Sequence, residues 1–536
     1  MVQMKEEKKI KISLLLLPFW SPLTPPLGIA CLKAYLKNIG YDAYTSDFNT
    51  ISELYECSNR YLAIIKKNVP DEHKGNISMI AYDILTNHLN AYNNCQSKNE
   101  MSEIVDILIK NNYFYNPSTE LINELMNIVD NFYLKLQEHL DKYIESHKSD
   151  VIGISVYSLT LGPSIFAFKH LKKRKKEIKT VMGGGIFADQ LSVDSKELKS
   201  FLNNTPFIDY IMIGEGELLW KYLLDNQFNT KRVICIQDVK GTMKLSEAVI
   251  PDFSDFNLKS YSQLALYASR SCPFNCSFCS ETVQWGKYRK KEVEMIVNEM
   301  QEISTKYNRR IILFGDSLLN PLITDLSRAL IKIDNKVYWD AYIRVSDEAF
   351  DINIVKLWRK AGFYRARLGI ESGSQSVLNI MNKRTNIKQI KITIKNLAEV
   401  GIKVTTYWVI GHPGETEEYF QETLDLLTEM KNYIYEADFH PFYFYPSGQV
   451  NSEQWTKDSG YHLLYPKEYS EKLIVPIWLL DEAPSRETIY SRVQRFAECC
   501  EQQGIPNPYS YAEIYFADRR WKGLHKNAVP MLADLT

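Results

Sequence analysis

Three cysteines in one short segment constrain this chain more than any other feature of its sequence. Cys272, Cys276 and Cys279 form a C-x3-C-x2-C run. Three thiolates at this spacing can converge on one metal centre, and cysteine thiolates hold iron–sulfur clusters or zinc. A closed zinc site needs a fourth N or S ligand, whereas Cys235 and His412, the neighbouring candidates, are distant in the sequence. The run therefore favours an iron–sulfur cluster with three protein ligands, and zinc is the alternative.

The cysteine run, with Phe278 before its third cysteine, resembles the cluster loop of the radical S-adenosylmethionine (SAM) enzymes. The resemblance implies a [4Fe–4S] cluster whose open iron binds the amino and carboxylate groups of SAM. It also implies an electron donor such as flavodoxin or ferredoxin. In this family SAM is cleaved reductively to methionine and a 5′-deoxyadenosyl radical, which abstracts a hydrogen atom from the substrate.

Composition places the chain among soluble globular proteins. Its 536 residues predict two to four domains. The formal net charge of −1 argues against a protein that binds nucleic acid through bulk electrostatics. A three-cysteine cluster loop needs reduced thiols, so we expect a cytoplasmic protein. The leucine run at 14–17 is too short for a membrane segment and predicts a buried strand.

The first half alternates between strand and helix patterns, as a Rossmann-like parallel sheet does. A helix is expected over 27–36, where two prolines precede the apolar pattern. The alternation stops between 51 and 148, which predicts a helical insertion that covers a substrate site or packs on the sheet. The predicted strands of this half are 10–17, 42–46, 151–156, 180–182 and 210–213.

Two glycine-rich turns follow successive predicted strands, at 183–185 and 214–217. Glycines at the carboxyl ends of parallel strands let a ligand approach the backbone closely. Two such turns indicate a ligand-binding crevice.

This half resembles the cobalamin-binding-like domain that precedes many radical SAM barrels, over 25–28, 151–155, 182–185 and 213–217. The resemblance implies loops that contact cobalamin. The chain has no Asp-x-His-x-x-Gly, which argues against an axial histidine ligand, and the domain as a scaffold without cobalamin is the alternative. The cobalamin-binding candidates are Ser155, Tyr157, Ser158, Gly183, Gly184, Gly185, Gly214, Glu215 and Glu217.

The second half predicts the partial (β/α)6 barrel of the radical SAM family. Polar residues placed after the strands belong to the catalytic end of such a barrel. The predicted strands are 264–269, 311–314, 336–343, 366–370, 404–410 and 438–445.

Residues after these strands stand where the family binds SAM. Gly315 and Asp316 match the positions that present acceptors to the SAM amine. Glu371 and Ser372 match the positions that bind the methionine or ribose group, and Arg344 could hold the SAM carboxylate. Each also has a purely structural alternative, such as a helix N-cap at Asp316. The SAM-binding candidates are Phe278, Gly315, Asp316, Ser317, Arg344, Glu371, Ser372 and Gly411.

Five further residues are candidates for a direct role in catalysis. His412 is a possible proton-transfer group, as is His440, although a histidine near a barrel mouth is more often structural. Cys499 or Cys500 is a candidate hydrogen-atom donor to a substrate radical, and Cys235 is a further candidate if the enzyme is cobalamin-free. Adjacent cysteines on a helix point in different directions, so a shared metal site is not expected.

These features predict an α/β chain with three parts. Residues 1–245 form a Rossmann-like cobalamin-binding-type domain with its insertion at 51–148, residues 246–450 the radical SAM barrel, and residues 451–536 a carboxyl-terminal extension. The expected activity is cobalamin-dependent methylation of an unactivated carbon in a peptide or natural product. The alternatives are a cobalamin-free radical SAM enzyme, such as a peptide epimerase or a rearrangement catalyst with a cysteine hydrogen donor, and a sensor without turnover.

Overall fold

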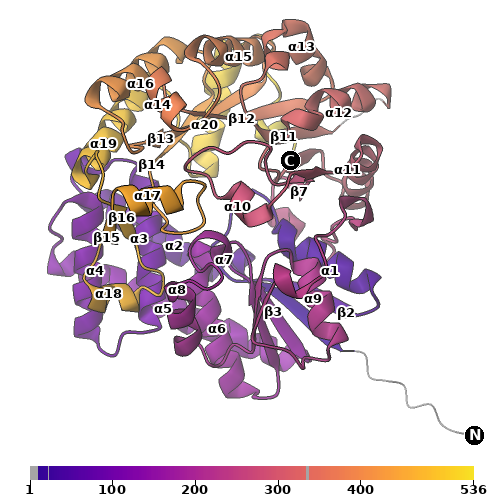
Figure 1. The fold of residues 1–536 in the computed structure, drawn as a ribbon, viewed down its shortest axis with the longest axis vertical. Coiled ribbons are helices and arrows are strands. Elements are labelled where there is room, and N and C mark those ends of the chain that lie inside the picture. The colour runs from indigo at the N-terminus through magenta and orange to yellow at the C-terminus, as the bar shows by residue number, and fades with distance from the viewer. Residues whose placement is uncertain (1–9, 22, 334–336) are drawn as a thin grey trace, which may run out of the picture.

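Two parallel sheets, one from each half of the chain, organise the structure (Figure 1). The computed structural model describes residues 10–21, 23–333 and 337–536. Each sheet has six strands, in the orders β2-β1-β3-β4-β5-β6 and β14-β13-β12-β11-β10-β7. The α/β fold class expected from the sequence is confirmed.

The first sheet contains every strand predicted for the amino-terminal half and one more. β1 is the buried leucine run, and Leu14, Leu15 and Leu16 are at most 1% exposed. The strand order changes direction at β1, which lies between β2 and β3, so a crevice is expected beyond the carboxyl ends of β1 and β3. The strands are β1 Lys11–Leu16, β2 Asp42–Asp47, β3 Val151–Ser155, β4 Lys179–Gly183, β5 Tyr210–Ile213 and the unpredicted β6 Val233–Cys235.

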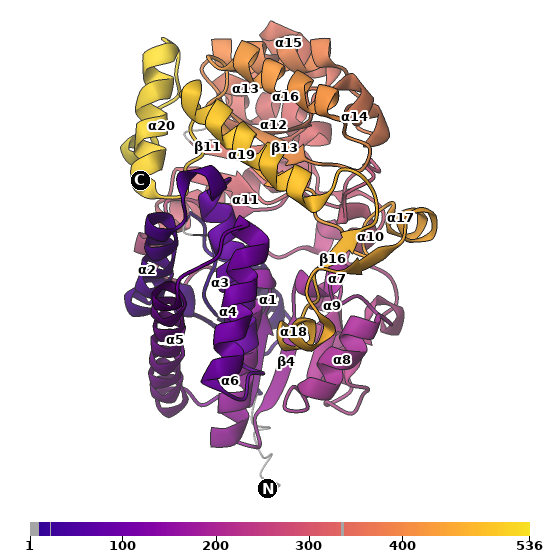
Figure 2. The ribbon, with the colours of Figure 1, turned by 90° about the vertical axis from the view of Figure 1, so that its left-hand side faces the viewer.

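Helices cover both faces of this sheet, and the insertion is helical as predicted. Phe132 of α5 packs in one core with Ile152 of β3 and Phe168 of α6, so part of the insertion covers the sheet (Figure 2). Its helices are α2 Ser52–Asn68, α3 Ile77–Tyr92, α4 Lys98–Tyr113 and α5 Thr119–Ser146. The other helices are α1 Leu27–Asn38, α6 Leu161–Arg174, α7 Ile186–Asp189, α8 Lys196–Asn204 and α9 Gly216–Asp225.

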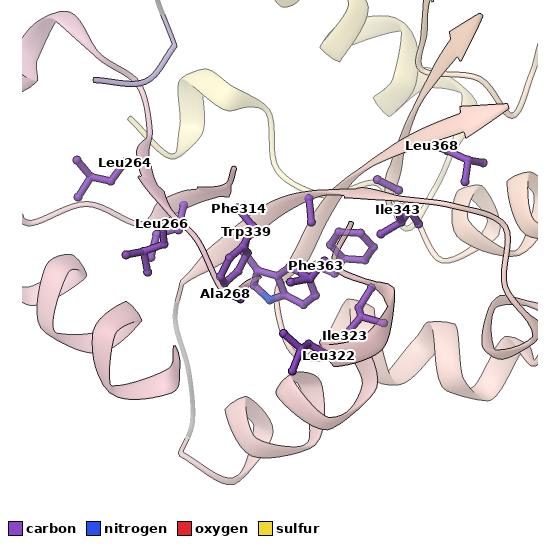
Figure 3. Packing of buried hydrophobic residues seen from close by; sticks show 14 of the residues in the cluster. Leu264, Leu266, Ala268, Phe314, Leu322, Ile323, Trp339, Ile343, Phe363 and Leu368 are labelled. Carbon is purple, nitrogen blue, oxygen red and sulfur yellow. The ribbon is translucent and has the colours of Figure 1, made fainter. Parts of the chain in front are cut away.

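The second sheet contains the six strands predicted for the barrel. Trp339 stacks on Phe363 with ring centroids 4.4 Å apart, within an apolar core under the strands (Figure 3). The predicted start of the third strand, Lys336, lies outside the described residues. The last strand ends at Pro441, four residues earlier than predicted, and Phe444 instead bridges to Trp478. The strands are β7 Leu264–Leu266, β10 Ile311–Phe314, β11 Tyr338–Ile343, β12 Phe363–Glu371, β13 Lys403–Ile410 and β14 Glu436–Pro441.

A short antiparallel pair, β8 Ser269–Arg270 and β9 Arg289–Lys290, flanks the segment that contains the three cysteines. The second sheet is otherwise surrounded by helices on its outer side (Figure 1). These helices are α11 Val293–Tyr307, α12 Asn320–Lys332, α13 Ile352–Lys360, α14 Gln375–Ile380, α15 Ile387–Glu399 and α16 Glu417–Met430. The short helix α10 Glu281–Trp285 instead lies between the two halves, in contact with α7 (Figure 1).

The carboxyl-terminal extension joins the two halves. Phe496 of α19 packs on Trp408 of β13, and the Asn112 side chain of the insertion donates a hydrogen bond to Tyr465. No helix in the described part of the chain is long and apolar enough to cross a membrane. The elements are α17 Ser452–Asp458, β15 Tyr461–Leu463, α18 Lys467–Lys472, β16 Trp478–Leu480, α19 Arg486–Gln502 and α20 Tyr511–Leu524.

Candidate functional site

The three-cysteine loop follows the first strand of the second sheet and is held by segments that follow later strands. The Ser277 amide donates to the Met381 carbonyl (3.0 Å), beyond β12. Beyond β14, the Asn451 amide donates to the Ser277 carbonyl (3.0 Å) and the Val450 amide to the Cys279 carbonyl (3.1 Å). The loop is therefore fixed by backbone hydrogen bonds at the carboxyl end of the sheet, where barrel active sites lie.

The three thiols are close enough to influence one another. The pKa of Cys279 is raised to about 12, mainly by burial, and the neighbouring Cys276 and Cys272 contribute in the same direction. The guanidinium of Arg344, 3.5 Å from the centroid of the Phe274 ring, opposes this effect at Cys272. A cation beside clustered thiolates suits an anionic metal–thiolate group.

No group of three or more His, Cys, Asp or Glu residues in the described ranges is arranged to hold a single metal ion. This finding does not count against a cubane cluster, because each cysteine there binds a different iron atom. The residues present, three thiols on a fixed loop with a buried arginine beside them, fit such a cluster.

A large cavity of about 1090 Å³ lies where the carboxyl ends of the two sheets face each other. It is lined by the glycine turns after β4 and β5 and by the turn after β10. All nine cobalamin-binding candidates line it, together with three SAM-binding candidates. These three are Gly315, Asp316 and Ser317. The structure thus brings the predicted cobalamin set and three of the eight predicted SAM residues to one cavity, called here the cofactor cavity.

In the first glycine turn, close packing requires glycine, in addition to the access that glycine gives a ligand to the backbone. Gly184 has a φ of +121°, and a Cβ added there would lie 2.4 Å from the Val156 carbonyl oxygen. Beside it, the Tyr157 ring packs on Trp20 with centroids 4.6 Å apart. Gly214, in the second turn, has a φ of +129° and no close neighbour. Glycine is needed at both positions because other residues rarely adopt this backbone conformation.

Two of the cobalamin-binding candidates are engaged by arginines that sequence reasoning did not consider. Glu217 and Glu215 form ion pairs with Arg270, and Glu215 also pairs with Arg289. All four side chains are mostly buried. Since Arg270 lies two residues before Cys272, these ion pairs connect the turn after β5 directly to the cysteine loop.

Asp316 fixes the strand that leads into the cysteine loop. Its carboxylate accepts hydrogen bonds from the Ala268 amide (2.9 Å to Oδ2) and from the Ser269 hydroxyl. Burial raises the pKa of Asp316 to about 6. Contact between Asp316 and the SAM amine stays a prediction.

The remaining SAM-binding candidates are held by protein partners and lie outside the lining of the cofactor cavity. Glu371 pairs with Lys383, and the Arg344 guanidinium donates to the Lys383 carbonyl. The fully buried Ser372 hydroxyl lies 3.1 Å from that of Thr423. Their contacts with SAM, and that of the half-buried Phe278, stay predictions.

Gly411 follows β13 and lines a second cavity instead. Its φ is +81°, and an added Cβ would lie 2.3 Å from the Ile489 side chain. Close packing of α19 against this turn therefore requires glycine, whatever the turn contributes to SAM binding.

His412 is fully buried behind the cysteine loop. Its Nδ1 lies 2.9 Å from the Pro413 carbonyl, so Nδ1 donates there and Nε2 accepts from the Ser277 hydroxyl at 3.0 Å. Burial lowers the pKa of His412 to about 4. With both nitrogens occupied, His412 is suited to position the loop, and its predicted proton-transfer role has no support in these contacts.

Of the three candidate hydrogen donors, Cys235 lines the cofactor cavity, whereas Cys499 and Cys500 do not. Cys500 is buried in the core beneath α19, and Cys499 lies 3.6 Å from the Thr428 hydroxyl. Cys31, which the sequence does not single out, also lines the cofactor cavity. The positions of Cys31 and Cys235 there depend on strand order, which the linear sequence does not display.

A parallel half-barrel with three cysteines on the loop after its first strand defines a radical SAM domain. Residues 266–427 match the family model of the Radical SAM superfamily.

Curated relatives align with about half of the chain. The anaerobic magnesium-protoporphyrin IX monomethyl ester cyclase of Cereibacter sphaeroides is 27% identical over 322 residues, 53% of this chain and 50% of the relative. The bacteriochlorophyllide d C-12(1)-methyltransferase of Chlorobaculum tepidum is 25% identical over 347 residues, 61% of this chain and 72% of the relative. The chain spans about half the length of the first of these relatives.

Solved structures extend the fold likeness over nearly the whole chain. The radical SAM methyltransferase TsrM from Kitasatospora setae, solved with tryptophan and a SAM analogue, has a TM-score of 0.61 and 13% identity, and covers 94% of this chain and 90% of its own. The cobalamin-dependent radical SAM enzyme OxsB has a TM-score of 0.53 and 16% identity, and covers 93% of this chain and 63% of its own. These neighbours share the fold of both halves.

Proposed function

We propose that this protein is a cobalamin-dependent radical SAM methyltransferase that methylates an unactivated carbon of a peptide or natural product. One observation carries the proposal: a single cavity is lined both by the glycine turns of the first sheet and by the turn after β10 of the second. Cobalamin held by the first sheet would then lie beside SAM held by the second.

The protein's own contribution is to place and enclose these groups. A cluster held by Cys272, Cys276 and Cys279 would supply the electron for SAM cleavage, and cobalamin would carry the transferred methyl group. Asp316 and the Glu217–Arg270 ion pair hold the segment that leads into the cysteine loop. The buried Arg344 places positive charge beside the cysteines.

The names of similar proteins are consistent with this assignment. TsrM, whose structure was also solved with cobalamin and a [4Fe–4S] cluster, and the relative from Chlorobaculum tepidum are methyltransferases. We infer a reducing compartment and a flavodoxin- or ferredoxin-type electron donor, because an oxygen-sensitive cluster must be kept reduced.

A second candidate is a cobalamin-free radical SAM enzyme with a cysteine hydrogen donor. The observation that favours it is the presence of Cys235 in the cofactor cavity, where its thiol donates to Asp238 at 3.4 Å. In that case Cys235→Ser would abolish turnover while SAM cleavage continued. Under the methyltransferase proposal the same variant remains active.

The proposal is tested by anaerobic reconstitution and a labelled methyl group. Wild-type protein, a variant with all three cluster cysteines changed to alanine, and the control variant Cys95→Ala are incubated with iron, sulfide and hydroxocobalamin. We expect about four irons in the wild type and the control and none in the triple variant. A label from methyl-labelled SAM that never enters a product, in protein that cleaves SAM and turns over substrate, would refute methyl transfer.

A further inference from the structure

A second cavity, of about 680 Å³, lies between helix α3, the end of β14 and the carboxyl-terminal extension. Its size is typical of sites for small organic ligands. Four residues line both this cavity and the cofactor cavity, so the two adjoin. They are Ser158, Ile186, Gln190 and Tyr445. A ligand in the second cavity can therefore reach the edge of the first.

The second cavity offers hydrogen-bond acceptors that lack strong partners within the protein. Asp83 of α3 accepts one hydrogen bond, from the Tyr443 hydroxyl at 2.6 Å. The backbone of Asp438 pairs with β13 in the sheet, but its carboxylate has no hydrogen bond or ion pair within the described part of the chain. The side-chain oxygen of Asn90, a residue 3% exposed, also has no partner in the described ranges. Asp83 and Asp438 are partly exposed, whereas the Asn90 oxygen is buried, and a buried acceptor without a partner is costly unless a donor arrives.

The cationic side chains near these carboxylates bind other protein groups. Arg486 donates to the Asn111 carbonyl and the Asn112 side chain, and its guanidinium lies 4.1 Å from the centroid of the Tyr490 ring. His462 pairs with Asp481, which also lines the cavity.

Two further arginines and one histidine influence Asp438. Arg367 is bound to Asp340 at 2.8 Å and Arg365 to Glu436. His440, which also lines the cavity, lies 3.0 Å from the Pro441 carbonyl through Nδ1. The acidic residues that line the second cavity outnumber the basic ones. The acidic residues are Asp83, Asp438, Asp481, Glu482 and Glu487, and the basic residues are Arg486, His440 and His462.

Apolar and aromatic side chains form the rest of the wall, among them Phe442, Trp478 and Ile489. Such surfaces accept the hydrocarbon part of a ligand, whereas the carboxylates require a donor with positive charge. Burial raises the pKa of Asp83 to about 6, as expected where a carboxylate has no full cationic partner.

We propose that this cavity is the substrate site and that it selects a substrate with a protonated amine on an apolar or aromatic body. Asp83 and Asp438 bind the ammonium group, Asn90 accepts a further N–H, and the body extends toward the four shared residues at the cofactor cavity. The inference deepens the proposed function and rests on it for the role of the cofactor cavity.

The test compares three probes of similar shape on reconstituted protein by isothermal titration at neutral pH: phenethylamine, phenethyl alcohol and hydrocinnamate. We expect the amine to bind at least about tenfold more tightly than the alcohol, the range for a hydrogen bond to a charged group, and the acid more weakly still. Asp438→Asn and Asp83→Asn should each abolish this preference. Asp325→Asn, on the exposed face of α12, is the matched control and should retain it.

Equal affinity for amine and alcohol, or no binding of the amine, would overturn the inference, as would a preference that survives both substitutions. The ligand series in the wild type needs no variant, so misfolding of a variant cannot decide the result. Iron content and 5′-deoxyadenosine formation in the same wild-type sample report separately on the proposed function. A sample that forms 5′-deoxyadenosine but shows no amine preference refutes the amine site alone.

Discussion

The hydrogen bond between His412 and Ser277 links the turn after β13 to the cysteine loop, and it can be tested directly. Both side chains are at most 1% exposed, and their atoms Nε2 and Oγ lie 3.0 Å apart. In His412→Phe the Ser277 hydroxyl loses its partner while buried, which costs about 1–3 kcal/mol. Ser277→Ala leaves His412 Nε2 unpaired at a similar cost.

A double-mutant cycle isolates this bond. Because the double variant has neither unpaired group, the two single losses should not add, and we expect a coupling of about 1–2 kcal/mol. For a domain of this size that corresponds to a melting shift of about 2–8 °C. Melting is followed anaerobically in apoprotein, and iron uptake by each variant shows whether the loop still accepts a cluster. Additive losses would refute the claim that His412 positions the loop through Ser277.

Three further predictions concern other parts of the account. Arg270→Leu should leave the buried Glu217 unpaired and destabilise the protein by about 3–5 kcal/mol, measured by thermal melting. The control Lys221→Leu breaks an exposed ion pair on α9, the helix that also contains Glu217, and should change the melting temperature little. Gly184→Ala should prevent correct folding of the turn after β4, measured as loss of soluble protein and of cobalamin retention. The control Gly241→Ala changes a glycine that also has a positive φ but has open space around it, so its effect on soluble yield should be smaller. The third concerns pH: burial lowers the pKa of His88 from 6.5 to about 3, so its stabilising contribution is complete above pH 6.5 and is lost as the pH falls toward 3. His88→Phe should therefore melt with a shallower dependence on pH over this interval, and an unchanged slope would contradict the assignment.

Much of the fold could be predicted because buried parallel strands are continuous apolar runs. β1 and β13 are recognisable in this way from sequence alone. β6 has only three residues, which is too short for a recognisable strand pattern. The aromatic pattern of the last barrel strand continues past Pro441 into a loop, so the sequence predicts this strand longer than it is.

Contacts between distant segments could not be predicted from the sequence. Arg270 and Glu215 are 55 positions apart and meet only because the two sheets face each other. The second cavity likewise combines Asp83 of the insertion with Asp438 of the barrel and Arg486 of the extension. Sequence motifs identify the loops that line the cofactor cavity. The hydrogen-bond and ion-pair partners of Glu217, Asp316 and His412 depend on tertiary packing and cannot be read from these motifs.

The central claim is that one cavity holds cobalamin beside a cluster-bound SAM, and cofactor content measures it most directly. Protein reconstituted anaerobically with iron, sulfide and hydroxocobalamin is desalted and assayed for iron and for cobalamin by absorbance. We expect about four irons and one tightly held cobalamin per chain. Four irons without retained cobalamin would contradict the role given to the first sheet, and protein that binds no iron would contradict the account at the cysteine loop itself.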